Sequence, residues 1–155
     1  MNLTHYLGLL HRAEQELARA LREVGDRHAD EADVVHLGRT LAAQCDAHAE
    51  ALAPVVARYG EDHAGGDEPE HLHSELFRGA RDGPLGLLRD LQDLYLMASE
   101  CDIAWTLVGQ AAQGLRDEEL QDIVQRCERE TAIQQRWLQT RLKQAAPQAL
   151  VVART

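Results

Sequence analysis

The sequence contains few aromatic residues and no segment with the pattern of a β-strand. Aromatic residues make up 4% of the 155 residues, and alternating Val, Ile and Thr runs bounded by hairpin turns are missing, which argues against a β-rich fold. The residues that dominate, Ala, Leu, Glu, Gln and Arg, are strong helix formers. Because the length fits one domain that can bury a real core, we expect a single all-α domain.

Positive charge is also scarce. The chain has 16 Lys and Arg residues against 26 Asp and Glu residues, and its formal net charge is −10. Lys143 is the only lysine. This balance argues against nucleic acid or an anionic membrane surface as a partner.

Long apolar runs are missing as well. No segment approaches the roughly 18 apolar residues of a membrane span. The first residues, MNLTHYLGLLHRAEQE, have no apolar run followed by a cleavage site. We therefore expect a cytoplasmic protein that does not bind a membrane.

The chain has only three cysteines, Cys45, Cys101 and Cys127. An odd number of cysteines without short-range pairing argues against a disulfide framework. We expect free thiols.

Apolar residues at helical spacing predict four helices. The first ends at Gly25, the second begins near Asp30, the third begins at the DGP sequence of residues 82–84, and Asp117 caps the fourth. The predicted ranges are 3–24, 30–59, 82–113 and 117 to the region before Pro147.

The lengths of the connections predict the topology. Helices one and two, and helices three and four, are joined by a few residues, so each pair should form an antiparallel hairpin. Residues 60–83 are long enough to cross the length of a bundle, and PEHLHSELF (69–77) within them has the pattern of a short helix. We predict an antiparallel four-helix bundle over residues 1–147 with a long crossover at 60–83, followed by a C-terminal tail at 148–155.

Each predicted helix directs polar or thiol groups toward the apolar face. Residues placed at intervals of about 100° around each helix put these groups near mid-length. The inward set is Glu14, Cys45, His48, Asp102, Cys127 and Glu130. A carboxylate on an apolar face is costly unless it is paired, protonated or bound to a metal.

This arrangement resembles the ferritin-like carboxylate proteins. That family directs one Glu from each of two helices, and a Glu-x-x-His pair from each of the other two, toward two metal ions. Glu14 and Asp102 match the single-carboxylate positions. CDAH (45–48) and CERE (127–130) stand where the Glu-x-x-His pairs are expected. The resemblance implies a ferritin-like bundle with an internal metal site.

The ligand set departs from the family pattern in both pairs. Cysteine replaces the first glutamate twice, and Glu130 replaces the second histidine. Because thiolates are soft ligands, the change argues against di-iron oxygen chemistry and favours a single ion such as zinc, held at about 2.0–2.3 Å. The cofactor is therefore a transition metal, zinc or iron, or none. In the metal-free alternative His48 pairs with Glu14 or Glu130.

Three functions follow from these alternatives: a metal-binding ferritin-like protein, an enzyme with thiol-based redox chemistry, and a metal-free oligomerising or adaptor bundle. Double replacement of glutamate makes the enzyme the weakest of the three. A second apolar stripe on helix three, formed by Leu96, Ile103 and Leu107, predicts a homodimer through that helix, unless the crossover residues Leu72, Leu76 and Phe77 cover it. The apolar trio Leu150, Val151 and Val152 makes the tail either a frayed terminus or a docking peptide for a partner.

Overall fold

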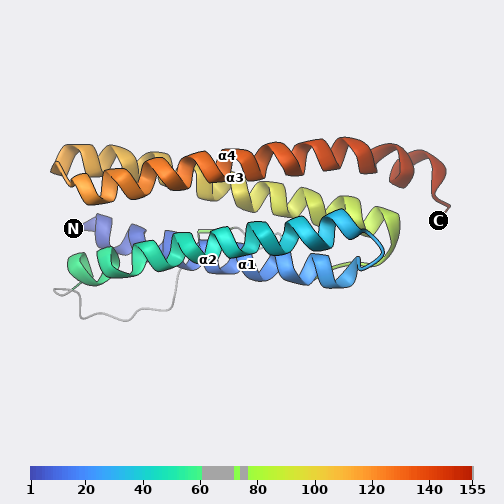
Figure 1. Ribbon diagram of the computed structural model, residues 1–155, viewed down its shortest axis with the longest axis horizontal. Helices are drawn as coiled ribbons and strands as arrows, with labels where there is room; N and C mark the ends of the chain where they lie inside the picture. The colour runs from blue at the N-terminus through green and yellow to red at the C-terminus, as the bar shows by residue number, and fades with distance from the viewer. Residues whose placement is uncertain (61–71, 74–76, 155) are drawn as a thin grey trace.

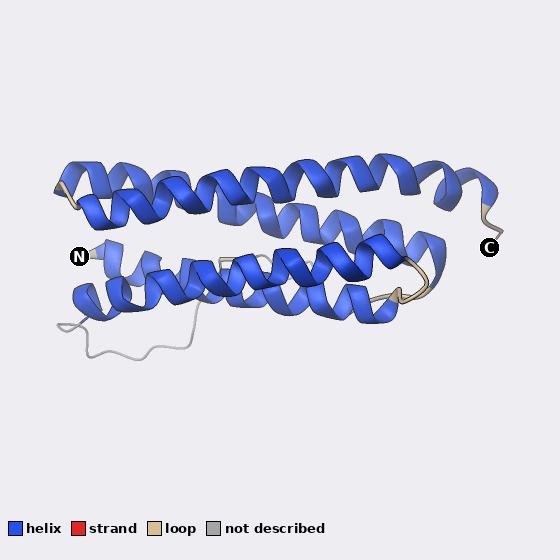
Figure 2. Ribbon diagram, viewed as in Figure 1, coloured by secondary structure: helices blue, strands red, loops and turns tan. Residues whose placement is uncertain are grey.

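The described residues form four α-helices. The computed structural model describes residues 1–60, 72–73 and 77–154. The helices are α1 (Asn2–Arg27), α2 (Ala32–Gly60), α3 (Gly83–Leu115) and α4 (Glu118–Pro147). No strand occurs in these ranges (Figure 2). The predicted all-α four-helix bundle is confirmed.

The helices form two antiparallel hairpins, α1 with α2 and α3 with α4 (Figure 1). The hairpins meet through contacts of α1 with α3 and of α2 with α4. Because α2 ends near the chain's first residue and α3 begins at the opposite end, α2 and α3 run in the same direction. The connection from Gly60 to Gly83 therefore crosses the length of the bundle, as predicted.

The crossover contributes side chains to the core. Leu72 and Phe77 are partly buried and pack against the buried cluster. The short helix predicted over 69–77 lies largely outside the described residues, as does Leu76. The described crossover residues thus extend the hydrophobic core formed by the four helices.

The prediction that Gly25 ends the first helix was wrong. Helix α1 continues to Arg27, and Gly25 is buried within it. A Cβ atom on Gly25 would lie 3.5 Å from Val35 Cα, and one on Gly38 would lie 3.2 Å from the Leu21 carbonyl oxygen. These glycines therefore allow the backbones of α1 and α2 to approach closely. The second helix also begins two residues later than predicted, at Ala32.

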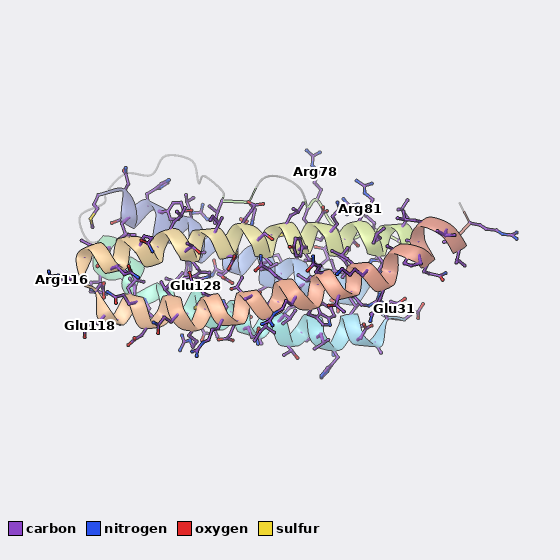
Figure 3. All side chains as sticks on the ribbon, turned by 90° about the horizontal axis from the view of Figure 1, so that it is seen from above. Glu31, Arg78, Arg81, Arg116, Glu118 and Glu128 are labelled. Carbon is purple, nitrogen blue, oxygen red and sulfur yellow. The ribbon has the colours of Figure 1, made fainter. Side chains whose placement is uncertain are left out.

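Asp117 caps α4, as predicted, and also joins the two hairpins. Its Oδ1 accepts a hydrogen bond from the Leu120 backbone N–H at 3.1 Å. Its Oδ2 accepts from the Tyr59 hydroxyl at 2.6 Å and from Arg58 at 2.9 Å. The turn before it places Arg116 in the left-handed region, with φ of 55°. Figure 3 shows Arg116 and Glu118 at this end of the bundle.

The opposite end is fastened by a second buried carboxylate, Asp90. Asp90 Oδ2 lies 2.8 Å from His28 Nε2 and accepts from the Arg81 backbone N–H at 2.9 Å. Its Oδ1 accepts from the Arg81 guanidinium at 2.8 Å. The network links the end of α1, the end of the crossover and the start of α3. Figure 3 shows Arg81 near the start of α3.

The C-terminal tail is helical rather than frayed. Residues Gln148–Val152 form a π-helical turn that continues directly from α4 beyond Pro147. Leu150, Val151 and Val152 are largely exposed, by 64% to 81%. The docking role suggested by the sequence stays a prediction.

The apolar stripe on α3 faces away from the core. Leu96, Ile103 and Leu107 are 37%, 54% and 51% exposed. No helix in the described part of the chain is both long and apolar enough to cross a membrane. These three side chains are exposed although they are apolar, and packing within the described part of the bundle does not bury them.

We expect Asp117→Ala to lower the free energy of unfolding by about 2 kcal/mol, because it removes the helix cap and leaves the Tyr59 hydroxyl without its acceptor. Burial raises the pKa of Asp117, but hydrogen bonds from Tyr59, the Leu120 N–H and Arg58 lower it overall. This contribution is present above the ordinary carboxyl pKa and is lost as the pH falls through the lowered value. Urea unfolding as a function of pH tests both statements.

Asp117→Asn is the matched variant, since asparagine keeps the cap but not the charge. It should retain more stability than Asp117→Ala at neutral pH and lose less on acidification than the native chain. Asp122→Ala, at an exposed position of α4, serves as the control. Equal losses for Asp117→Ala and Asp122→Ala would contradict the capping role.

Candidate functional site

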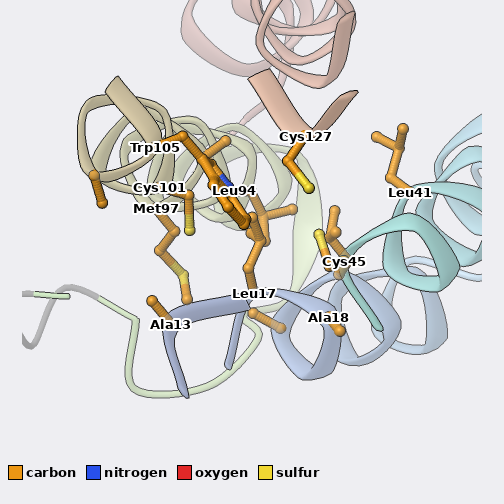
Figure 4. Packing of buried hydrophobic residues seen from close by; sticks show 14 of the residues in the cluster. Ala13, Leu17, Ala18, Leu41, Cys45, Leu94, Met97, Cys101, Trp105 and Cys127 are labelled. Carbon is orange, nitrogen blue, oxygen red and sulfur yellow. The ribbon is translucent and has the colours of Figure 1, made fainter. Parts of the chain in front are cut away.

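A cluster of polar and thiol side chains lies at mid-length between the four helices. It contains Glu14 of α1, Cys45 and His48 of α2, Trp105 of α3 and Cys127 of α4, all at most 1% exposed. Figure 4 shows Cys45, Trp105 and Cys127 pointing into the bundle from their three helices. We refer to these five residues as the central cluster.

Glu14 is the carboxylate of the central cluster. Its Oε1 accepts a hydrogen bond from Trp105 Nε1 at 2.8 Å. Its Oε2 is buried and has no hydrogen-bond partner among the described residues. The helical spacing that placed Glu14 on an inward face did not identify Trp105 as its partner. A buried tryptophan usually donates its indole N–H to an acceptor, and this rule could have suggested an inward carboxylate as the partner of Trp105.

His48 lies between two carboxylates. Its Nδ1 is 3.3 Å from Glu14 Oε1, and its Nε2 is 3.6 Å from Glu130 Oε1. Its ring meets Trp105 edge to face, with ring centroids 6.0 Å apart. Neither ring nitrogen makes a well-formed hydrogen bond within the described structure. A neutral imidazole has only one N–H donor, so in the metal-free protein both carboxylates are faced by a donor only when the ring is protonated.

The side chains around His48 favour its protonated form by raising its pKa. Burial acts to lower the pKa of His48, but the neighbouring Cys127 and Glu14 side chains outweigh burial and raise the pKa to about 10. These contacts favour the imidazolium form of His48 in the metal-free cluster.

Cys45 is a protonated thiol in this arrangement. Burial, reinforced by the charge of Glu14, raises the pKa of Cys45 well above its ordinary value. Its Sγ lies 3.8 Å from Gln134 Oε1, and Gln134 Nε2 donates to Gln44 Oε1 at 3.1 Å. These contacts link α2 to α4 beside His48.

The structure brings together four of the six predicted residues and places the other two farther out. Glu14, Cys45, His48 and Cys127 are buried at the centre. Glu130 lies at the edge, where its side chain is 31% exposed. Asp102 is partly exposed, and burial raises its pKa.

The inward placement predicted for Asp102 needs correction. Its neighbour Cys101 is fully buried instead. One residue corresponds to about 100° of helix rotation. The apolar stripe on the outer side of α3 broadens its apolar arc, so the pattern defined the buried face of this helix poorly.

Cys101 belongs to a separate contact at the seam between α1 and α3. There His73 of the crossover lies with Nε2 3.0 Å from the Ala13 carbonyl oxygen and 3.9 Å from Cys101 Sγ. Its Nδ1 is 3.5 Å from Glu100 Oε2. His73 therefore covers the side of the bundle next to Glu14.

The central cluster contains metal-ligand residue types in a partly suitable geometry. Two donors held about 2.0 Å from a tetrahedral ion lie about 3.3 Å apart. His48 Nδ1 has this separation from Glu14 Oε1, but Oε1 is the oxygen that already accepts the hydrogen bond from Trp105. Across the described ranges, no three His, Cys, Asp or Glu side chains converge as a bound ion would require. Metal binding would therefore need side-chain rotation within the cluster.

No protein-family model, curated protein or solved structure matches this chain.

We expect the stability that His48 contributes to depend on pH in the presence of a chelator. Because its folded-state pKa is raised to about 10, the contribution is complete below the ordinary histidine pKa and is lost as the pH rises through the folded value. The difference in unfolding free energy between the native chain and His48→Gln should therefore shrink between about pH 6.5 and about pH 10. Urea unfolding of both proteins under reducing conditions measures it. A difference that is constant over this range would contradict a buried imidazolium.

Proposed function

We propose that this chain is a ferritin-like protein whose central cluster binds one transition-metal ion through Glu14, Cys45, His48 and Cys127. The observation that supports the proposal is a set of three buried atoms without hydrogen-bond partners in the described structure, namely Glu14 Oε2 and both ring nitrogens of His48. A buried polar atom that is left unsatisfied costs about 1–3 kcal/mol. The ring nitrogens of a protonated His48 have ion-pair contacts at 3.3 and 3.6 Å, so this cost applies most directly to Glu14 Oε2. A cation between these side chains would satisfy the carboxylate and one ring nitrogen together.

The residue types favour zinc over a di-iron centre. Two thiolates, one imidazole and one carboxylate form a four-donor set that suits a single zinc ion. A di-iron centre needs carboxylates that bridge two cations, and Glu14 is the one carboxylate within the central cluster. Glu130, whose side chain is 31% exposed, and the partly exposed Asp102 are less buried than the central cluster, so the proposed ligand set does not include them.

Neighbouring residues would orient the side chains of Glu14 and His48 for metal binding. Trp105 holds one oxygen of Glu14 and leaves Oε2 available. Glu130 lies on the far side of the His48 ring from Glu14, and a carboxylate in that position orients a metal-bound histidine through its other N–H. The thiols of Cys45 and Cys127 and the imidazolium of His48 would each release one proton on binding, so binding should weaken as the pH falls. With four protein donors, zinc would supply a structural cross-link between α1, α2 and α4.

The competing proposal is a metal-free bundle that acts as an oligomerising or adaptor protein. The observation that favours it is the exposed apolar stripe on α3, formed by Leu96, Ile103 and Leu107. In the metal-free bundle, the His48 imidazolium would form an ion pair with Glu14 at all metal concentrations. The two proposals differ in their response to zinc.

If the metal proposal is correct, the protein purified under reducing conditions should contain zinc or take it up. Free zinc at a hundredfold excess over its dissociation constant should stabilise the fold by about 2.7 kcal/mol, and a chelator should reverse the effect. Elemental analysis and thermal unfolding with chelator and with added zinc measure this. The absence of metal, together with no effect of chelator or zinc, would leave the metal-free bundle.

Matched cysteine variants locate the site. Cys45→Ser should abolish stabilisation by zinc, because it removes a ligand. Cys101→Ser should retain it, because Cys101 is an equally buried thiol that lies outside the proposed ligand set, with its Sγ 3.9 Å from His73 Nε2. Loss of the zinc effect in both variants, or in neither, would contradict the proposed ligand set.

A further inference from the structure

A cavity of about 620 Å³ lies at the end of the bundle that Asp90 fastens. Its wall comes from the end of α1 and the turn after it, from the start of α3, and from the end of α4 and the tail. No residue of the central cluster lines it. Its volume falls in the range of about 300–1,000 Å³ that is usual for small-molecule sites.

His28 contributes to this wall a ring nitrogen that has no protein partner. The residue is 8% exposed, and its Nε2 lies 2.8 Å from Asp90 Oδ2. Asp90 also accepts two hydrogen bonds from Arg81, at 2.9 and 2.8 Å, as an ionised carboxylate does. Nε2 is therefore the donor to Asp90, and the neutral ring carries its lone pair on Nδ1. The described residues supply no donor to Nδ1, so His28 presents an acceptor to the cavity.

Asp30 is the second wall residue whose polar group lacks a partner. It lies in the turn after α1 and is exposed. Its carboxylate makes no hydrogen bond or ion pair with the described residues. Both unpaired groups of the wall are therefore acceptors, and one of them carries a negative charge.

The two guanidinium groups in the wall are already paired with carboxylates. Arg27 lies 2.7 Å from Asp82, and Arg141 lies 2.8 Å from Glu31 and 2.7 Å from Asp33. Figure 3 shows Glu31 at this end of the bundle. Three carboxylates and two guanidiniums line the cavity, so the wall has a surplus of negative charge. An anion would find no free cationic partner among these side chains.

We propose that this cavity binds an aliphatic diamine or polyamine, whose ammonium groups are held by His28 Nδ1 and the Asp30 carboxylate. An ammonium group offers three N–H donors and no acceptor, which matches the two unpaired wall groups. Leu87 and Ala145 line the same cavity and offer apolar surface to the methylene groups between the amines. Two helices, α1 and α4, end at the cavity and one begins there, and helix ends attract cations.

Two further observations favour an organic cation. The net charge of −10 raises the concentration of cations near the surface of the protein. Among the described residues, no three His, Cys, Asp or Glu side chains converge as a metal ion would require. A ligand with separated ammonium groups does not need such convergence.

Calorimetric titration with putrescine, a diaminobutane, tests the proposal at neutral pH and about 0.15 M salt, where nonspecific charge attraction is screened. Putrescine should bind, and the uncharged diol of the same length should not. Asp30→Asn should weaken putrescine binding about tenfold or more, because it removes a charge-assisted hydrogen bond. Asp26→Asn is the matched control, since it removes the same charge from an exposed position of α1 outside the cavity. It should bind putrescine as the native chain does.

Histidine-selective NMR spectra locate the bound ligand. Putrescine should shift the ring signals of His28, which are identified by their absence in His28→Gln, and should leave those of His48 unchanged. Magnesium ion should not displace putrescine. Absence of putrescine binding, equal binding of the diol, equal weakening by Asp30→Asn and Asp26→Asn, or displacement by magnesium would overturn the proposal.

Discussion

The burial of one carboxylate, Glu14, is the constraint on which the interior of the bundle depends. A charge in an apolar core is tolerated only when partners surround it. Trp105 donates a hydrogen bond to Glu14 Oε1 at 2.8 Å, and His48 Nδ1 lies 3.3 Å from the same oxygen, where a protonated imidazole supplies the opposite charge. These partners come from α3 and α2, so the relative positions of three helices depend on one oxygen atom.

Buried carboxylates also fasten both ends of the bundle. Asp117 holds Tyr59 and the first turn of α4 at one end. Asp90 holds His28 and Arg81 at the other. Each accepts several directed hydrogen bonds, which specify one relative position of the elements, whereas aliphatic contacts permit sliding. The hairpins are therefore fixed at three levels along their length.

The interior differs from that of the ferritin-like carboxylate proteins in a chemically consistent way. Cys45 and Cys127, at the positions where the proposed ferritin-like arrangement would place carboxylates, are soft donors, and both are fully buried. Burial raises the pKa of Cys45 and favours its protonated form, and a bound cation would favour the thiolate. Under the proposed function, a metal ion would replace the protonated network of the central cluster and would give Glu14 Oε2 the partner that it lacks in the described structure.

The sequence by itself determined the helices, their pairing and most of the central cluster. Helical spacing of leucines marks each element, and the short and long connections leave one economical topology, because a chain of 22 residues between Gly60 and Gly83 can span a bundle. The inward positions of Glu14, Cys45 and His48 followed from the narrow apolar faces of α1 and α2.

Only the tertiary structure decided the features that depend on neighbouring helices. The apolar face of α3 is broad, so its rotation, which buries Cys101 in place of Asp102, was fixed by packing against α1 and α4. Gly25 continues its helix because α2 approaches at that point. The bond from Trp105 to Glu14 joins residues 91 positions apart. No local pattern encodes such a contact, because it exists only when two hairpins are brought face to face.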